Sequence, residues 1–133
     1  MVQKVTRRND YSDLDLDFIA HPTTGDVVKK TGVDAIKRSV RNLILTNFYD
    51  RPFRSYIGSN AQKILFDNIN IFTATFLRDA IAEVITNFEP RAELLEVYVS
   101  ALPDENAYSA TIVFSVINST QPIVLDLILD RVR

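Results

Sequence analysis

The sequence of 133 residues has no cysteine, no tryptophan and a single histidine, His21. Without cysteine the chain can form no disulfide, no thiolate metal site and no cysteine nucleophile. One histidine excludes two-histidine metal sites and argues against a Ser-His-Asp triad. The three glycines, Gly25, Gly32 and Gly58, lie too far apart for a phosphate-binding loop or a dinucleotide fingerprint. We therefore expect no cofactor and no metal.

Long hydrophobic runs are also missing. The richest stretch, from Ile123 to Val132, is interrupted by Asp126 and Asp130. The basic residues near the N-terminus are followed by the polar residues 9–12 and not by an apolar segment. These patterns predict no membrane insertion and no targeting segment, and we expect the chain to be made and assembled in a reducing compartment.

The net charge of −2 gives no sign of a nucleic-acid-binding protein. The charge is unevenly distributed, because residues 1–67 carry 11 basic and 8 acidic side chains whereas residues 68–133 carry 4 and 9. The plainer interpretation is two differently solvated faces. The alternative is head-to-tail contact between neighbouring molecules.

The chain is 47% hydrophobic and 24% charged, as is usual for a globular protein, and its length predicts one domain over residues 1–133. Residues 1–30 are expected to form an extended N-terminal segment. Within it, aspartate alternates with apolar residues from Asp13 to Phe18, which is typical of a short strand with a solvated acidic face. The aspartates resemble a calcium loop, but Phe18 and Thr24 stand where that loop needs Gly and Glu.

Helical periodicity follows in three segments. The first helix is expected from Thr31, as its N-cap, to about Asn47. Ser59 and Gln62 are spaced as a capping box for a short second helix. A third helix is predicted from about Thr73 to Phe88, where Pro90 ends it. Its predicted apolar stripe comprises Phe76, Leu77, Ala80, Ile81, Val84 and Phe88.

After Pro90 the apolar period changes from 3.6 to 2. One strand is predicted around residues 95–101, a turn at residues 103–106 and a second strand at residues 108–116. Residues 123–133 fit either a third strand or a short helix. Helices followed by a small, mainly antiparallel three-stranded sheet predict an α+β fold. The residues expected to share a face in the first two strands are Leu95, Val97, Val99 and Ala101, and Tyr108, Ala110, Ile112, Phe114 and Val116.

Two charged features could carry function. The carboxylates Glu83, Glu89, Glu93 and Glu96 lie near the helix-to-sheet junction, and a pair of carboxylates can hydrolyse a glycosidic bond. No tryptophan and no evident cleft support that interpretation. In the tripeptide Glu89-Pro90-Arg91, the arginine can contact the last carbonyls of the helix or pair with a carboxylate, which predicts either a structural clamp or a charged docking point.

The loop after the first helix carries aromatic residues together with arginines, which are frequent at protein interfaces. We expect Phe53 to fill the core and the arginines to make contacts. His21 is expected on the surface without chemistry. The interface candidates in this loop are Arg51, Pro52, Phe53, Arg54 and Gly58.

Several sequence motifs follow one another in a fixed order over nearly the whole chain. The motifs are Tyr11-Ser12-Asp13-Leu14-Asp15, Ala35-Ile36-Lys37-Arg38-Ser39-Val40, Arg51-Pro52-Phe53 with Gly58, Leu65-Phe66-Asp67-Asn68, Phe88-Glu89-Pro90-Arg91 and Phe114-Ser115-Val116. In this order they resemble the baseplate wedge, or sheath-initiator, family of contractile phage tails, which includes a baseplate component of type VI secretion systems. Residues 13–30 depart from that pattern.

The resemblance implies a structural, non-enzymatic protein of the virion, located in the tail baseplate and assembled in the host cytoplasm. Its implied partners are the tail sheath protein, other baseplate wedge proteins and tube-proximal baseplate proteins, with six copies around the tail axis. Some members carry a lysozyme label, so a peptidoglycan hydrolase with Glu89 as general acid is the alternative.

The resemblance also implies that sheath subunits add strands to this protein's sheet. An edge strand accepts another strand through its unpaired backbone groups, and a proline at Leu125 would test one such edge. The candidate edge residues are Ile123, Leu125, Leu127, Leu95 and Val97.

Overall fold

The computed structural model describes residues 12–15, 17–117 and 119–131. Tyr11, in the first motif above, and Leu16, in the alternation from Asp13 to Phe18, lie outside the described residues. The chain divides into two compact units, one ending at Arg38 and the other running from Ser39 to Arg133. The prediction of a single domain stays a prediction.

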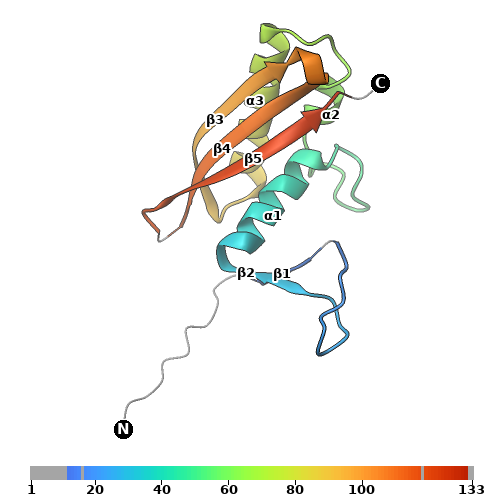
Figure 1. Ribbon diagram of the computed structural model, residues 1–133, viewed down its shortest axis with the longest axis vertical. Helices are drawn as coiled ribbons and strands as arrows, with labels where there is room; N and C mark the ends of the chain where they lie inside the picture. Colours follow the sequence, from blue (N-terminus) through green and yellow to red (C-terminus); the bar gives the residue numbers. More distant parts are fainter. Residues whose placement is uncertain (1–11, 16, 118, 132–133) are drawn as a thin grey trace. The chain divides into compact units, whose positions relative to one another are not determined.

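The N-terminal unit is built on a short antiparallel pair, β1 (Ser12–Leu14) and β2 (Lys29–Thr31) (Figure 1). Pro22 and Gly25 lie in a turn, and Ala20 and Val27 form a bridge on either side of it. The solvated acidic face is wrong at Asp15, whereas Asp17 is exposed as predicted. Asp15 is buried whereas Phe18 is exposed, since Asp15 is paired with an arginine.

Helix α1 (Gly32–Leu45) begins directly after β2 and ends close to the predicted position. Its apolar stripe is buried at Ile36, Val40 and Ile44, whereas Val33 at the start is exposed. Gly32 has φ of +60°, a conformation that glycine adopts without the steric cost of a side chain.

Helix α2 (Ala61–Ile64) is a single turn, and the predicted capping box at its start is wrong. Ser59 is buried and donates its hydroxyl to Ile44 O at 2.7 Å, 15 residues earlier in the chain. Gln62 accepts a hydrogen bond from the Asn47 side chain. Both side chains therefore tie α2 to the end of α1. Ser59 Oγ also accepts a hydrogen bond of 3.3 Å from Ala61 N–H, but this is not the bond that a capping box makes.

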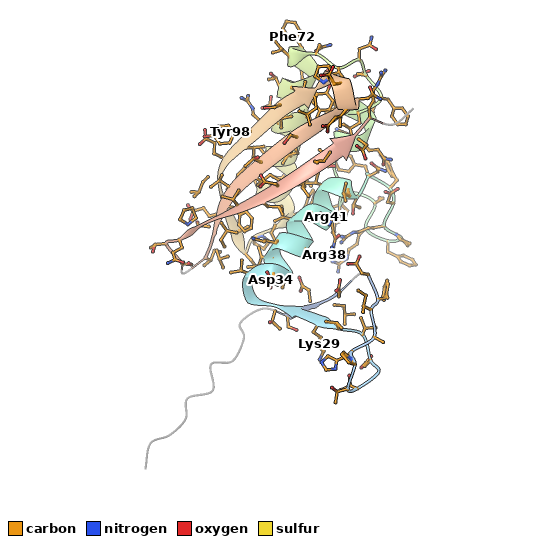
Figure 2. All side chains as sticks on the ribbon, viewed as in Figure 1. Lys29, Asp34, Arg38, Arg41, Phe72 and Tyr98 are labelled. Atoms are coloured by element: carbon orange, nitrogen blue, oxygen red, sulfur yellow. The ribbon has the colours of Figure 1, made fainter. Side chains whose placement is uncertain are left out.

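Helix α3 (Ile71–Phe88) begins at Asn70, whose side chain accepts a hydrogen bond of 2.8 Å from Thr73 N–H. It starts two residues earlier than predicted. Phe76, expected on the apolar stripe, is exposed. Figure 2 shows Phe72 near the start of the helix, and it is exposed as well. The buried side of the helix consists of Thr73, Ala74, Leu77, Ile81, Val84 and Ile85.

The sheet has three antiparallel strands, β3 (Ala92–Leu102), β4 (Ala107–Val116) and β5 (Pro122–Asp130), in the order β3-β4-β5. The predicted α+β fold is confirmed, and the ambiguous C-terminal segment is a strand. Helix α3 packs against the sheet with its main contacts on β3 (Figure 1). The turn η1 (Pro103–Glu105) joins β3 to β4 as predicted.

The alternation of β4 is confirmed, because every residue of its predicted apolar face is buried. The face predicted for β3 is only partly correct. The register shifts between Leu94 and Glu96, so Leu95 lies in a bulge and is 54% exposed. Val97 beyond the bulge is buried. A bulge reverses which side chains face the core, and this is why the simple alternation fails here.

Candidate functional site

The junction between α3 and β3 holds the most buried charge of the described chain. Glu89 follows the last residue of α3 and is only 2% exposed. Arg91 donates two bonds to its carboxylate, from Nε to Oε1 at 2.7 Å and from an Nη to Oε2 at 3.0 Å. Ser39 donates its hydroxyl to Oε2 from α1, 50 residues earlier. Such a two-pronged pair fixes the direction of the side chains as well as their charge.

These contacts decide the protonation of Glu89. Burial by itself raises the pKa of a carboxyl group, because it disfavours the charged form. Hydrogen bonds from Arg91 and Ser39, together with the charge of Arg91, outweigh burial, so the pKa of Glu89 lies below its ordinary value. A general acid in glycoside hydrolysis needs a raised pKa, and the Glu89 site does the opposite.

The other carboxylates of the sequence hypothesis do not share this environment. Glu83 on α3 and Glu93 and Glu96 on β3 are exposed. Within residues 12–15, 17–117 and 119–131, no group of three or more His, Asp or Glu side chains could hold a metal ion. Of these four glutamates, Glu89 is therefore the one that is buried, and it is held in an ion pair with Arg91.

The interface candidates in the loop from Arg51 to Gly58 differ in their exposure to solvent. Phe53, expected in the core, is wholly exposed and has φ of +65°. Arg51, Pro52 and Arg54 are exposed, as a contact surface requires. Gly58 is buried, and a Cβ there would lie 2.5 Å from the backbone carbon of Asn47. Gly58 thus allows the loop to return against the end of α1.

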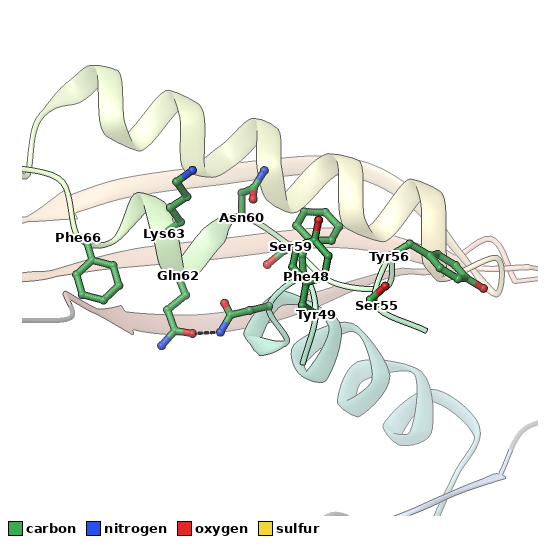
Figure 3. A pocket seen from close by; sticks show the side chains of 10 residues that line it. Phe48, Tyr49, Ser55, Tyr56, Ser59, Asn60, Gln62, Lys63 and Phe66 are labelled. Atoms are coloured by element: carbon green, nitrogen blue, oxygen red, sulfur yellow. Dashed lines mark hydrogen bonds between the residues drawn. The ribbon is translucent and has the colours of Figure 1, made fainter. Parts of the chain in front are cut away.

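A groove of about 760 Å³ lies beside this loop (Figure 3). Its rim carries the exposed aromatic side chains of Tyr49, Tyr56 and Phe66. The hydrogen bond between Asn47 and Gln62 crosses from the end of α1 to α2. The sequence indicated the aromatic loop, but Phe66 is remote from it in the chain, and no local pattern links the two.

The sheet presents two outer strands. β3 and β5 each pair with β4 alone among the described strands, so the candidate residues on both strands do lie on edges. Leu127 and Val97 are buried in the core, Ile123 and Leu125 are half-buried, and Leu95 is exposed at the bulge. Their role in accepting a strand stays a prediction.

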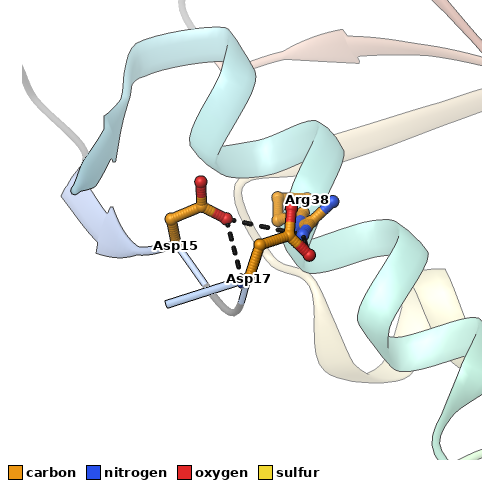
Figure 4. A network of polar contacts seen from close by, with 3 residues as sticks. All are labelled: Asp15, Asp17 and Arg38. Atoms are coloured by element: carbon orange, nitrogen blue, oxygen red, sulfur yellow. Dashed lines mark hydrogen bonds and ion pairs between the residues drawn. The ribbon is translucent and has the colours of Figure 1, made fainter. Parts of the chain in front are cut away.

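An ion-paired cluster in the N-terminal unit was not predicted. Arg38 lies 3.4 Å from Asp15 Oδ1 and also pairs with Asp17, whose own N–H bonds to Asp15 (Figure 4). The cluster explains why Asp15 is buried. The alternating aspartates were the only trace of this cluster in the sequence, and the same alternation is typical of a strand with a solvated acidic face. His21 is exposed, as expected.

Solved structures with this fold include chains of two baseplates and a protein named as a tail lysozyme. A chain of the six-fold symmetrised anti-feeding prophage baseplate has a TM-score of 0.64 and 23% identity, covering 90% of this chain and 84% of that one. A chain of the postcontracted pyocin R2 baseplate has a TM-score of 0.54 and 17% identity, with coverage of 88% and 97%. A Geobacter sulfurreducens protein named as a tail lysozyme has a TM-score of 0.68 and 24% identity, with coverage of 74% and 89%. At these identities the likeness shows the fold alone.

Comparison of sequences identifies the family as well as the fold. The family model described as "Baseplate wedge protein gp25" matches residues 30–120. The baseplate wedge protein gp25 of Enterobacteria phage T4 is 32% identical over 113 residues, which is 85% of either chain. The chain belongs to this family, the gp25 baseplate wedge proteins of contractile tails. None of the described helices is both long and apolar enough to cross a membrane.

Proposed function

We propose that this baseplate wedge protein joins the inner wedge ring to the first sheath ring, and that it starts sheath assembly by accepting a sheath strand on its sheet. The observation that carries the proposal is the open, regular edge of β5. Six copies around the tail axis would offer six such edges, in keeping with the six-fold symmetry of the anti-feeding prophage baseplate that shares the fold.

The register identifies the backbone groups that face the open edge. Arg131 N–H bonds to Asn106 O at 3.0 Å, and these two residues continue the pairing of Ala107 with Asp130. In an antiparallel pair, residues that bond to the partner alternate with residues whose N–H and C=O point away. The odd-numbered residues of β5 therefore bond to β4, whereas Val124, Asp126 and Ile128 direct their backbone groups to the open edge.

The other edge is less suited to receive a strand. β3 carries the bulge at Leu95, which interrupts the alternation of its outward backbone groups. Bulges are one of the devices that protect edge strands from pairing. The pairing of β5 with β4 has a constant register from Asp130 to Pro122, so its outer row is continuous. β5 is thus the better acceptor.

A non-enzymatic role agrees with the state of Glu89. The buried ion pair keeps its carboxylate charged, and the other three carboxylates considered for hydrolysis, Glu83, Glu93 and Glu96, are exposed. If the chain nevertheless hydrolysed peptidoglycan, the Glu89→Gln variant would lose that activity in a turbidity assay. We expect no activity in either protein.

The register also supplies a sharp test of strand addition. Val124→Pro removes an outward N–H and should leave the fold intact, since edge positions tolerate proline. Val124→Ala keeps the N–H and removes most of the side chain. In co-sedimentation with the sheath protein of the same virus, Val124→Ala should attach and Val124→Pro should not. Equal attachment of the two variants, with unchanged circular dichroism, would contradict β5 as the acceptor.

Leu125→Pro, which the sequence suggested as the test, is unsuitable on its own. Leu125 lies opposite Ile112, and its N–H faces β4. This proline should unfold part of the sheet and so reports on folding. It serves as the control that confirms the assigned alternation, with a lower melting temperature than Val124→Pro.

A further inference from the structure

The side chains along the β5 edge indicate what kind of strand it accepts. We infer that the added strand is amphipathic, with an aliphatic side chain opposite Leu129 and a basic side chain near Asp126. This inference rests on the proposed function, because it concerns the same edge, and it names the chemistry by which the edge selects its strand.

The first feature is an apolar cleft of about 250 Å³ beside the C-terminal half of β5. Its floor is formed by buried residues, among them Ile44, Leu65 and Leu129, and its walls include Leu45 and Ile128, which are 50% and 66% exposed. In strand addition, backbone bonds supply affinity and pockets for alternate side chains supply specificity. The cleft is such a pocket.

The geometry of a sheet determines which residue of the added strand enters the cleft. Side chains directly opposite each other on paired strands point to the same face of the sheet. Leu129 points into the core and lines the cleft, so the residue paired with it is directed there as well. An aliphatic side chain at this position would cover Leu45, the exposed leucine that lines the cleft beside Leu129.

The second feature is the charge on the opposite face of β5. Val124, Asp126, Ile128 and Asp130 are exposed and alternate apolar with acidic, and β5 carries no basic residue. Thr111 donates a hydrogen bond of 2.8 Å to Asp126 Oδ1, which holds that carboxylate in position. Opposite charges on neighbouring strands attract and like charges repel. The solvent face of the added strand therefore carries lysine or arginine near Asp126.

The test uses the full chain and the sheath protein of the same virus in co-sedimentation. Asp126→Lys should weaken attachment about fivefold or more, because it turns an attraction into a repulsion. Leu45→Ala should weaken it about threefold by removing a cleft wall. The matched controls are Asp104→Lys, in an exposed turn, and Leu14→Ala, a leucine 56% exposed on β1; both should attach normally.

Two competitor peptides probe the chemistry directly. Both are acetylated, amidated 11-residue strands with leucine on one face, and they carry either lysine or glutamate on the other. The lysine peptide should displace the sheath protein from the wild-type chain, and the glutamate peptide should do so only from Asp126→Lys. Equal competition by both peptides, or none by either, would overturn the inference.

Failure of the inference can be distinguished from failure of the proposed function. If Val124→Pro blocks attachment while Asp126→Lys and Leu45→Ala attach like their controls, the edge is correct and the selected strand is not amphipathic in this way. If Val124→Pro attaches normally, β5 is not the acceptor, and both proposals fall together.

Discussion

Glu89 is the residue whose environment says most about this protein. Its carboxylate is buried, receives hydrogen bonds from Arg91 and Ser39, and follows directly after α3. The cost of burying a charge is offset here by a close partner and a hydroxyl donor. These contacts join α1 to the junction of α3 and β3, and the clamp that the tripeptide predicts stays a prediction.

Removing the partner of a buried charge tests the clamp. Arg91→Ala should lower the free energy of unfolding by about 3 kcal/mol, because the Glu89 carboxylate stays buried without its cation. Glu89→Gln should cost less, since the amide has no charge to desolvate. Urea denaturation of the three proteins measures both effects. A loss below about 0.5 kcal/mol for Arg91→Ala would remove the clamp argument.

The lowered pKa of Glu89 makes a separate prediction about pH. A carboxylate whose pKa is lower in the folded chain than the ordinary 4.5 stabilises the fold above pH 4.5, and this stabilisation is lost as the pH falls through the folded pKa. The unfolding free energies of the wild-type chain and Glu89→Gln should therefore converge on acidification below that pH. A difference that stays constant down to the acid transition would mean that Glu89 is not charged in the fold.

At the scale of elements, helix α3 shows how local sequence and tertiary packing share control. Asn70 caps the helix through a bond from Thr73 N–H. Asn60 occupies the corresponding position of α2, but its side chain makes no capping bond. Asparagine precedes both helices, but its side chain caps only α3.

This contrast gives a matched pair of variants. Asn70→Ala should destabilise the chain by about 1 kcal/mol, because the helix loses a capping acceptor. Asn60→Ala should stay within about 0.5 kcal/mol of the wild type. Thermal or urea unfolding distinguishes them, and equal losses would show that the Asn70 side chain is not a cap of energetic importance.

The sequence predicted the elements well where one local pattern dominates. The helix ending at Pro90 and the alternation of β4 follow directly from periodicity and from the chemistry of proline. It failed where a distant contact decides. Ser59 donates its hydroxyl to Ile44 O and does not form the predicted capping box with Gln62, and the bulge at Leu95 shifts the alternation of β3.

The candidate site was predictable to a similar extent. The pairing of Arg91 with a carboxylate was one of two contacts that the motif Glu89-Pro90-Arg91 predicted, whereas Ser39 lies 50 residues from Glu89 and has no local signal. Phe53 was expected in the core because aromatic residues usually are buried. Its backbone, with φ of +65°, turns it outward instead, and no pattern in a single sequence reports that conformation.

At the scale of the whole molecule, the chain is a baseplate wedge protein with two surfaces that we propose as contacts for other proteins. The β5 edge is proposed for the sheath, and the loop carrying Arg51, Phe53 and Arg54 is a proposed contact with other baseplate proteins. An apolar side chain that is wholly exposed contributes little to the fold, so its presence is better explained by an interface.

Phe53 allows this interface to be tested without unfolding the chain. Phe53→Asn should change stability by no more than about 0.5 kcal/mol, since asparagine tolerates a positive φ. It should nevertheless reduce co-purification with the wedge proteins of the same baseplate. Phe18→Asn is the matched control, because Phe18 is also exposed and has φ of +51°. Normal co-purification of Phe53→Asn would exclude the loop as that contact.

The central claim, that the chain starts sheath assembly, is tested most directly by co-assembly. The purified chain is mixed with the sheath protein of the same virus, alone and together with the other wedge proteins, and the products are viewed by negative-stain electron microscopy. The account predicts rings or short sheaths only in mixtures that contain the chain, and none with Val124→Pro. Sheath that forms equally well without the chain in the wedge mixture would contradict it.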